Sequence, residues 1–300
     1  MITRVATFAM NERMLEASLR TQARMSEAQI QQATGSVSTD YGGLGRSAGT
    51  LVSLEVSLAR SKSQASASEE AGNRVQMMSD AVGAMSDLLS SFRASLSSAI
   101  SAGGDDATLT ATAQSLLEEL ASLLNTRFEG RYLFAGSDTA TAPVDLSAYA
   151  ATDVATQDTT YYQGNGVEAS VALSPERTLT YGVTGDAAAF EQALRALSAV
   201  ANATTTPDTA TLQAISELSV QAVDALAAVQ GKLSVDAATL ERSVAAQTDH
   251  QDATTSLITA TNGADVTALA VALSSYETQL QASYAALAKV QSLSLLDYLR

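Results

Sequence analysis

The 300-residue sequence contains no cysteine and no tryptophan, and only three of its residues are proline. The absence of cysteine excludes disulfides and thiol chemistry. The three prolines, Pro143, Pro175 and Pro207, all lie in the middle of the chain. Because proline interrupts helices, both flanks of the chain can form long uninterrupted helices.

Positive charge is also scarce, since 17 lysines and arginines face 32 aspartates and glutamates, for a net charge of −15. Phosphate binding requires clustered basic side chains, so we expect no nucleic-acid partner. Residues 1–60 carry six arginines and five acids (+1), and residues 266–300 carry two charges of each sign (0). Near-neutral ends and an acidic middle indicate that the ends pack against protein and that the middle is solvated.

Long apolar runs are missing too. No run approaches the ~18 residues that a membrane span requires, so we expect no membrane partner. The N-terminus does not resemble a secretory signal, because Glu12 and Arg13 interrupt the short apolar stretch after Arg4. These features fit a cytosolic protein, and they equally fit a protein that is exported without a cleavable signal.

The apolar residues that are present favour helix. Although 46% of the residues are hydrophobic, only 5% are aromatic, and alanine, leucine and valine supply most of the apolar content. Residues 3–34 have a helical composition, which Gly35 and the glycine-rich residues 40–45 interrupt. A weak apolar stripe in this first helix consists of Val5, Phe8, Leu15, Leu19 and Ile30.

Two later segments carry residues at alternating spacings of three and four, the heptad pattern by which one helix packs along another. The first seam consists of Val75, Met78, Val82, Met85, Leu89, Phe92 and Leu96. The second consists of Leu212, Ile215, Ser219, Ala222, Leu226, Val229, Leu233, Asp236 and Leu240. Between them, residues 131–181 are rich in threonine, tyrosine, glycine and valine, and residues 167–173 and 178–183 alternate in polarity, which predicts a small β-rich insertion.

The last segment continues the heptad spacing to the C-terminus and is almost uncharged. A coil of two such helices would be poorly soluble alone, so we expect this seam to be an assembly interface inside a polymer. The candidate interface residues are Val266, Leu269, Leu273, Tyr276, Leu280, Leu287, Val290 and Leu293.

The predicted fold is mainly α with a small β-rich insertion, and its N- and C-terminal segments build a long antiparallel coiled-coil helical rod. Residues 1–40 with 265–300 would form a terminal coiled-coil assembly domain. Residues 41–135 with 187–264 would form a helical rod domain, and residues 136–186 an inserted β-rich domain.

Several stretches resemble a known family. Residues 130–143 resemble the motif that closes the N-terminal helical region of flagellar hook-associated proteins of the third type, the hook–filament junction proteins of the flagellin superfamily. Residues 162–166 resemble the turn in their inserted domain, and residues 229–233 resemble the start of their returning helix. Residues 264–265, 276–284 and 292–299 are similar to the family's C-terminal end. Residues 33–36 depart from the usual turn, so the first two helices can join at a different bend.

The resemblance implies a structural axial protein of the bacterial flagellum that joins hook to filament. It implies export without a cleavable signal to the extracellular hook–filament junction. The implied partners are further copies of the chain in a ring or tube, another hook-associated protein, flagellin or the filament cap, and, before export, a chaperone.

Three alternatives are weaker. A filament flagellin typically closes its chain directly after Leu-Leu-Arg, whereas here Leu296 is followed by residues 297–300. A generic coiled-coil scaffold would not need a β-rich insertion. We expect no enzyme, cofactor or metal site, because a single histidine, His250, without cysteine cannot form the usual His/Cys metal cluster and lacks an evident nucleophile.

Overall fold

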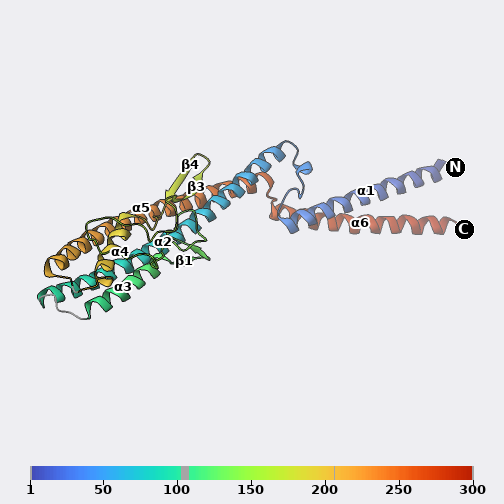
Figure 1. The fold of residues 1–300 in the computed structure, drawn as a ribbon. Coiled ribbons are helices and arrows are strands. Elements are labelled where there is room, and N and C mark those ends of the chain that lie inside the picture. The colour runs from blue at the N-terminus through green and yellow to red at the C-terminus, as the bar shows by residue number, and fades with distance from the viewer. Residues whose placement is uncertain (1, 103–107, 206, 299–300) are drawn as a thin grey trace. The chain divides into compact units, whose positions relative to one another are not determined.

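The structure, a computed structural model, describes the backbone of residues 2–102, 108–205 and 207–298 and, within these, the side chains of residues 9–289. The chain forms two compact units (Figure 1): unit 1 contains residues 1–60 and 250–300, and unit 2 contains residues 61–249. The elements are α1 (Ile2–Thr34), the 3-10 helix η1 (Tyr41–Ser47), α2 (Ala48–Ser101), α3 (Leu109–Leu124), β1 (Arg127–Phe128), β2 (Arg131–Tyr132), β3 (Ala169–Ser174), β4 (Arg177–Tyr181), α4 (Ala188–Ala201), α5 (Thr209–Asn262) and α6 (Val266–Tyr298).

In unit 2, α2 and α5 lie side by side and run antiparallel. Ser61 Oγ donates a hydrogen bond to Gln247 Oε1 (2.8 Å), and the Oγ atoms of Ser68 and Ser243 are 3.5 Å apart. Residue numbers therefore fall along α5 as they rise along α2, which is the antiparallel arrangement. Every residue of the first predicted seam is buried, and in the second seam only Val229 is partly exposed. The two heptads and the antiparallel rod are therefore confirmed.

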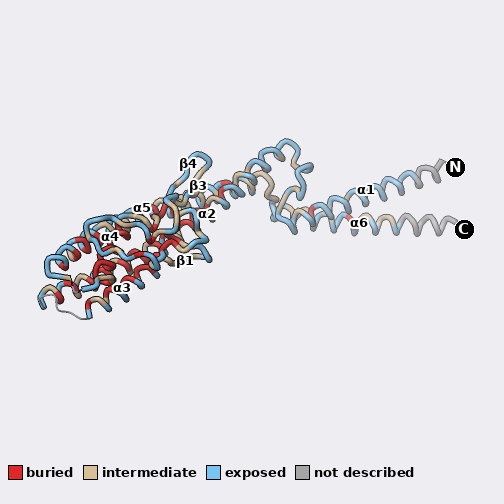
Figure 2. The backbone as a smooth tube through the Cα atoms, viewed as in Figure 1, coloured by how far each residue is buried: buried red, intermediate tan, exposed pale blue. Residues whose placement is uncertain are grey.

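The shorter helices α3 and α4 pack on each other and complete the core of unit 2. Their buried faces are aliphatic, with Leu117, Leu120 and Leu124 on α3 and Leu194 and Leu197 on α4. Burying a leucine side chain stabilises a fold by about 1.5–3 kcal/mol. With dozens of buried apolar residues in one cluster, unit 2 has the core of an independently stable fold (Figure 2).

Among the described residues, α5 is the helix that is long and apolar enough, by length and composition alone, to cross a membrane. The sequence showed no continuous apolar run of that length. Only 33% of its most apolar window is buried, which is the share that a single heptad seam provides. Because that seam fills the core of unit 2, we interpret α5 as the core helix of a packed unit.

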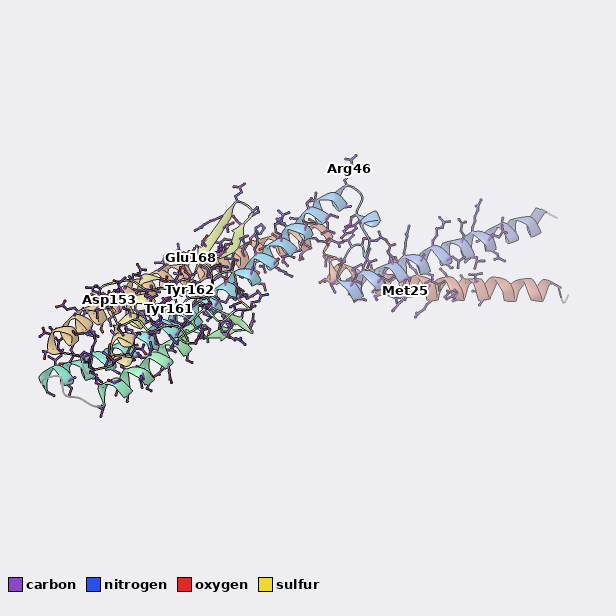
Figure 3. The ribbon with its side chains drawn as sticks, in the orientation of Figure 1. Met25, Arg46, Asp153, Tyr161, Tyr162 and Glu168 are labelled. Carbon is purple, nitrogen blue, oxygen red and sulfur yellow. The ribbon has the colours of Figure 1, made fainter. Side chains whose placement is uncertain are left out.

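The insertion contains the small antiparallel hairpin β3–β4, as its composition predicts, and otherwise irregular structure, and a shorter hairpin, β1–β2, lies just before it. β1 pairs with β2, and β3 pairs with β4. The two stretches singled out in the sequence, 130–143 and 162–166, lie against each other: Asn165 N donates to Ala135 O (3.1 Å), and Asn165 Oδ1 accepts from Ser137 N (3.0 Å). Figure 3 marks Tyr162 in this region, where its hydroxyl lies 2.9 Å from Asn165 O. Burial raises the pKa of Tyr162 to about 12.

A buried ion pair on α4 holds an irregular strap, residues 151–158, against the helix. Arg195 Nη1 donates to Val154 O (2.5 Å), and Glu191 Oε1 accepts from Asp158 N (2.8 Å). Arg195 Nε lies 3.0 Å from Glu191 Oε1 but is not aligned for a hydrogen bond, whereas Nη2 donates to Glu191 Oε2 at 3.2 Å. Since both charges are almost fully buried, each depends on the other and on the strap's backbone.

The β3–β4 hairpin is held to α5 by polar side chains. Asp236 occupies a buried seam position, and its Oδ2 accepts from Gly182 N (3.2 Å) at the end of the hairpin. Lys232 Nζ donates to Gly182 O (2.8 Å) and pairs with Glu168. Burial raises the pKa of Asp236, against the opposing effects of the Gly182 hydrogen bond and of Lys232.

Candidate assembly surface

In unit 1, α1 and α6 pack along each other as an antiparallel pair, with the end of α1 beside the start of α6 (Figure 1). Their contact buries little. Of the described apolar residues of unit 1, only Ala28, Leu51 and Leu280 are buried, and Figure 2 shows α1 and α6 mostly exposed. Each helix has 33 residues, and a pair of that length without a substantial core gains little stability from its own contact.

The predicted interface residues on α6 divide into two groups. Leu280 is buried, and four more, Leu269, Leu273, Tyr276 and Leu287, are half-buried at heptad spacing. Val266 is 49% exposed. The side chains of Val290 and Leu293 lie outside the described residues. The structure therefore places most of the described members of this seam on the face of α6 that packs toward α1.

The face that α1 presents to α6 was not found from the sequence. Its buried and half-buried residues include Met14, Ser18, Thr21, Met25 and Ala28, spaced by alternate steps of four and three, and Asn11 and Gln31 extend the row by three residues at either end. Figure 3 marks Met25 on this helix. The seam is small and partly polar, and Ser18 Oγ bonds to its own helix at Met14 O (2.9 Å). Hydropathy alone gives no signal for such a seam, although its heptad spacing is regular.

The described part of the apolar stripe that the sequence shows on α1 lies elsewhere on the helix, and the side chains of its first two members, Val5 and Phe8, lie outside the described residues. Leu15, Leu19 and Ile30 are each more than half exposed, and so is Met10. On α6, Val271 and Tyr284 are also more than half exposed. A shallow hollow on α6 is lined by Val271, Ser274, Ser275, Thr278, Gln279 and Ala282. Small side chains at helical spacing allow a second helix to approach closely.

The charge of unit 1 suits such an approach. Unit 1 carries eight basic and nine acidic residues, a net charge of −1, whereas unit 2 carries nine basic and 23 acidic residues, a net charge of −14. Copies of unit 1 can therefore come together with little electrostatic repulsion. Copies of unit 2, each with a net charge of −14, would instead repel one another.

The single histidine lies in unit 1, where His250 Nε2 is 3.0 Å from Ser57 Oγ on an exposed part of the helices. Within the described parts of the chain, no cluster of three or more histidine, cysteine, aspartate or glutamate residues could hold a metal ion. The surface features of unit 1 are thus apolar contacts and backbone geometry.

No protein-family model matches this sequence, and no curated protein matches it. Among solved structures, a protein from Vibrio parahaemolyticus that is provisionally assigned as a flagellar hook-associated protein aligns with a TM-score of 0.57 and 16% sequence identity. The alignment covers 71% of this chain and 96% of that one. FlgL from Bacillus cereus aligns over 70% of this chain and 96% of its own, with 16% identity and a TM-score of 0.42.

The likeness to the Vibrio protein extends over nearly all of that protein, although few residues are identical. Paired long helices with a small β-rich insertion, which the heptad spacing and composition predict for this sequence, are the architecture observed in units 1 and 2. This chain therefore shares its fold with the Vibrio protein over the aligned 71% of its length.

Proposed function

We propose that this chain is a structural axial protein of the bacterial flagellum, the adaptor that joins hook to filament, and that it has no enzymatic activity. The observation that carries the proposal is the surface of unit 1: two long helices that bury almost nothing against each other and expose apolar residues on their outer faces. Exposed apolar surface of this kind marks an interaction site. The fold supports a flagellar assembly as that interaction.

In this proposal each of the three predicted parts of the chain has its own role. Residues 1–40 with 265–300 assemble with neighbouring subunits, and residues 41–135 with 187–264 form the rod. Residues 136–186 form the insertion, which faces solvent. The low charge of unit 1 and the acidic surface of unit 2 support an inner position for the former and an outer position for the latter.

The proposed contacts combine two sets of residues. The first is the predicted seam on α6, which includes Leu287, Val290 and Leu293. The second is the outer face of α1, where Leu15 and Leu19 lie more than half exposed. A neighbouring helix that covers a leucine on this face gains about 1.5–3 kcal/mol from its burial.

The proposed partners are other copies of the chain in a ring or tube, another hook-associated protein on one side, and flagellin or the filament cap on the other. Export proceeds without a cleavable signal, with a chaperone covering the apolar surface beforehand, and the protein ends at the extracellular hook–filament junction.

Electron microscopy of purified flagella, labelled with an antibody to this chain, tests the proposal. A single band of label at the boundary between hook and filament is the expected result. Label along the whole filament would identify a flagellin instead. The absence of label from flagella, with the protein found in the cytoplasm, would favour a scaffold unrelated to motility.

A further inference from the structure

The two connections that link α1 and α6 to the rest of unit 1 are joined to each other. Val37 N donates to Asn262 O (2.7 Å), and Ala264 N donates to Gly35 O (2.9 Å). These bonds flank an antiparallel β-bridge between Ser36 and Gly263. The first connection follows α1 and the second precedes α6, so two segments far apart in the sequence form a short ladder.

The side chain of Asn262 extends this ladder by one step. Its Oδ1 accepts from Ser38 N (3.1 Å), and its Nδ2 donates to Ser38 O (3.1 Å). The amide therefore pairs with the backbone of Ser38 as another strand residue would. Only asparagine or glutamine offers a donor and an acceptor on one side-chain group in this arrangement. Gln31 Nε2 adds a further bond, to Val37 O (2.9 Å).

Glycines fix the points at which the helices stop. Gly35 has a φ of +66°, a conformation that ends α1 and that side chains with a Cβ atom disfavour. At Gly263 a Cβ atom would lie 2.3 Å from Thr259 O, so no other residue fits there without a shift of the backbone. Asp265 then starts α6, because its Oδ1 accepts from the backbone amides of Thr267 and Ala268 (3.0 Å each).

We propose that residues 35–38 and 262–264 act as one joint, in which Asn262 is the positioning residue that sets the angle between the α1–α6 pair and the adjoining ends of α2 and α5. Two untied connections of this length would each bend independently. The ladder couples them, so α1 and α6 change their orientation together and not independently. Breaking the Asn262–Ser38 pairing shortens the ladder by one step and weakens the coupling, while leaving every helix and the two backbone hydrogen bonds in place. This inference concerns unit 1 alone and does not depend on the flagellar role.

Distance measurement between two spin labels tests the joint. The chain has no cysteine, so Thr255→Cys on α5 and Ala270→Cys on α6 give two unique labelling sites on exposed residues that flank the joint. In the full chain, we expect a single narrow distance distribution between the labels. Asn262→Asp replaces the Nδ2 donor by an oxygen that faces Ser38 O, and we expect the distribution to widen at least twofold.

The matched control is Gln29→Glu. It makes the same change from amide to carboxylate on an exposed part of α1, outside the joint. It should leave the distribution as narrow as in the parent, and circular dichroism should show equal helix content in all three proteins. A broad distribution in the parent, an unchanged distribution in Asn262→Asp, or equal widening in Gln29→Glu would each overturn the proposal.

Discussion

The α2–α5 pair in unit 2 and the α1–α6 pair in unit 1 are both antiparallel pairs of long helices, but different residues form their seams. In unit 2 the seam consists mainly of leucine, methionine, phenylalanine, isoleucine and valine, with Ser219, Ala222 and Asp236 among them, and almost all are fully buried. In unit 1 the side contributed by α1 has two methionines that are only half-buried, and the residues between and after them are small or polar, such as Ser18 and Thr21. The heptad spacing is the same in both pairs. The size and polarity of the seam residues therefore decide how much stability the packing of each pair supplies.

The two units also differ in their net charge. Unit 2 surrounds its core with an excess of 14 acidic residues, which keeps it solvated, and unit 1 is nearly neutral with apolar residues facing outward. A unit with its own core needs no neighbour, whereas a pair of helices without one gains its stability by association. The same helical geometry thus serves folding in one unit and, by our proposal, assembly in the other.

The largest expected effect breaks unit 2 at the centre of its seam. Met85→Asp places an unpaired charge at a fully buried position, which should cost about 5 kcal/mol of unfolding free energy. Urea denaturation followed by circular dichroism measures this cost. Ala94→Asp, on an exposed position of the same helix, is the control and should change the midpoint little. Equal midpoints for the two variants would contradict the register of the seam.

The next effect concerns the strap on α4. Arg195→Met leaves the buried Glu191 charge unpaired and Val154 O without its donor, which should destabilise unit 2 by about 3 kcal/mol. Arg177→Met removes an exposed arginine and should cost almost nothing. Thermal denaturation of both variants checks the difference. If Arg195→Met melts with the parent, the ion pair does not stabilise the strap.

A smaller effect, of opposite sign, is expected at Asp236. Because burial raises its pKa in the folded state, protonation favours folding, and the stability that this group contributes is lost as the pH rises through the folded pKa. Asp236→Asn keeps an acceptor for Gly182 N without the charge, so it should raise the Tm of unit 2 by about 2 °C at pH 7.

The advantage of Asp236→Asn should shrink as the pH is lowered and the parent carboxyl becomes protonated. Glu168 raises the pKa of Asp236 and Lys232 lowers it, and the substitution removes both charge interactions together with the cost of burying the carboxylate, so the comparison measures their sum. A variant that is less stable than the parent at pH 7 would show that pairing with Lys232 outweighs the cost of burial.

The parts of the fold that were predictable from the sequence are those in which large apolar residues repeat. Met85 and Leu226 belong to seams that periodicity alone identifies, and the alternation in residues 167–173 predicts a strand of the β3–β4 hairpin. The α1 seam was missed because residues such as Ser18 and Ala28 carry no hydropathy signal. The apolar residues that do stand out on α1 are the exposed ones.

The joint and the strap could not be predicted for a different reason. Asn262 and Ser38 are 224 positions apart, as the hydrogen bonds between them record, and neither belongs to a repeating pattern. The Glu191–Arg195 spacing on α4 is common on exposed helix faces, so it does not by itself predict a buried pair. Such contacts depend on tertiary structure, where one side chain meets the backbone of a distant segment.

The smallest expected effect on the isolated chain is at Leu19, and it separates assembly from folding. Leu19 is 56% exposed on α1 and contributes little to the fold of the monomer. Leu19→Glu should therefore leave the thermal melt of the monomer unchanged. In a ring or tube every subunit would lose the burial of this leucine, about 1.5–3 kcal/mol each, and would also bury a charge. Attachment of filaments and swimming should be lost while export continues, so that subunits or flagellin accumulate in the medium.

Gln22→Glu adds the same charge at an exposed polar position three residues along the helix and should leave cells motile. Normal swimming with Leu19→Glu, or a large drop in the monomer's Tm, would mean that this face of α1 is not an assembly surface.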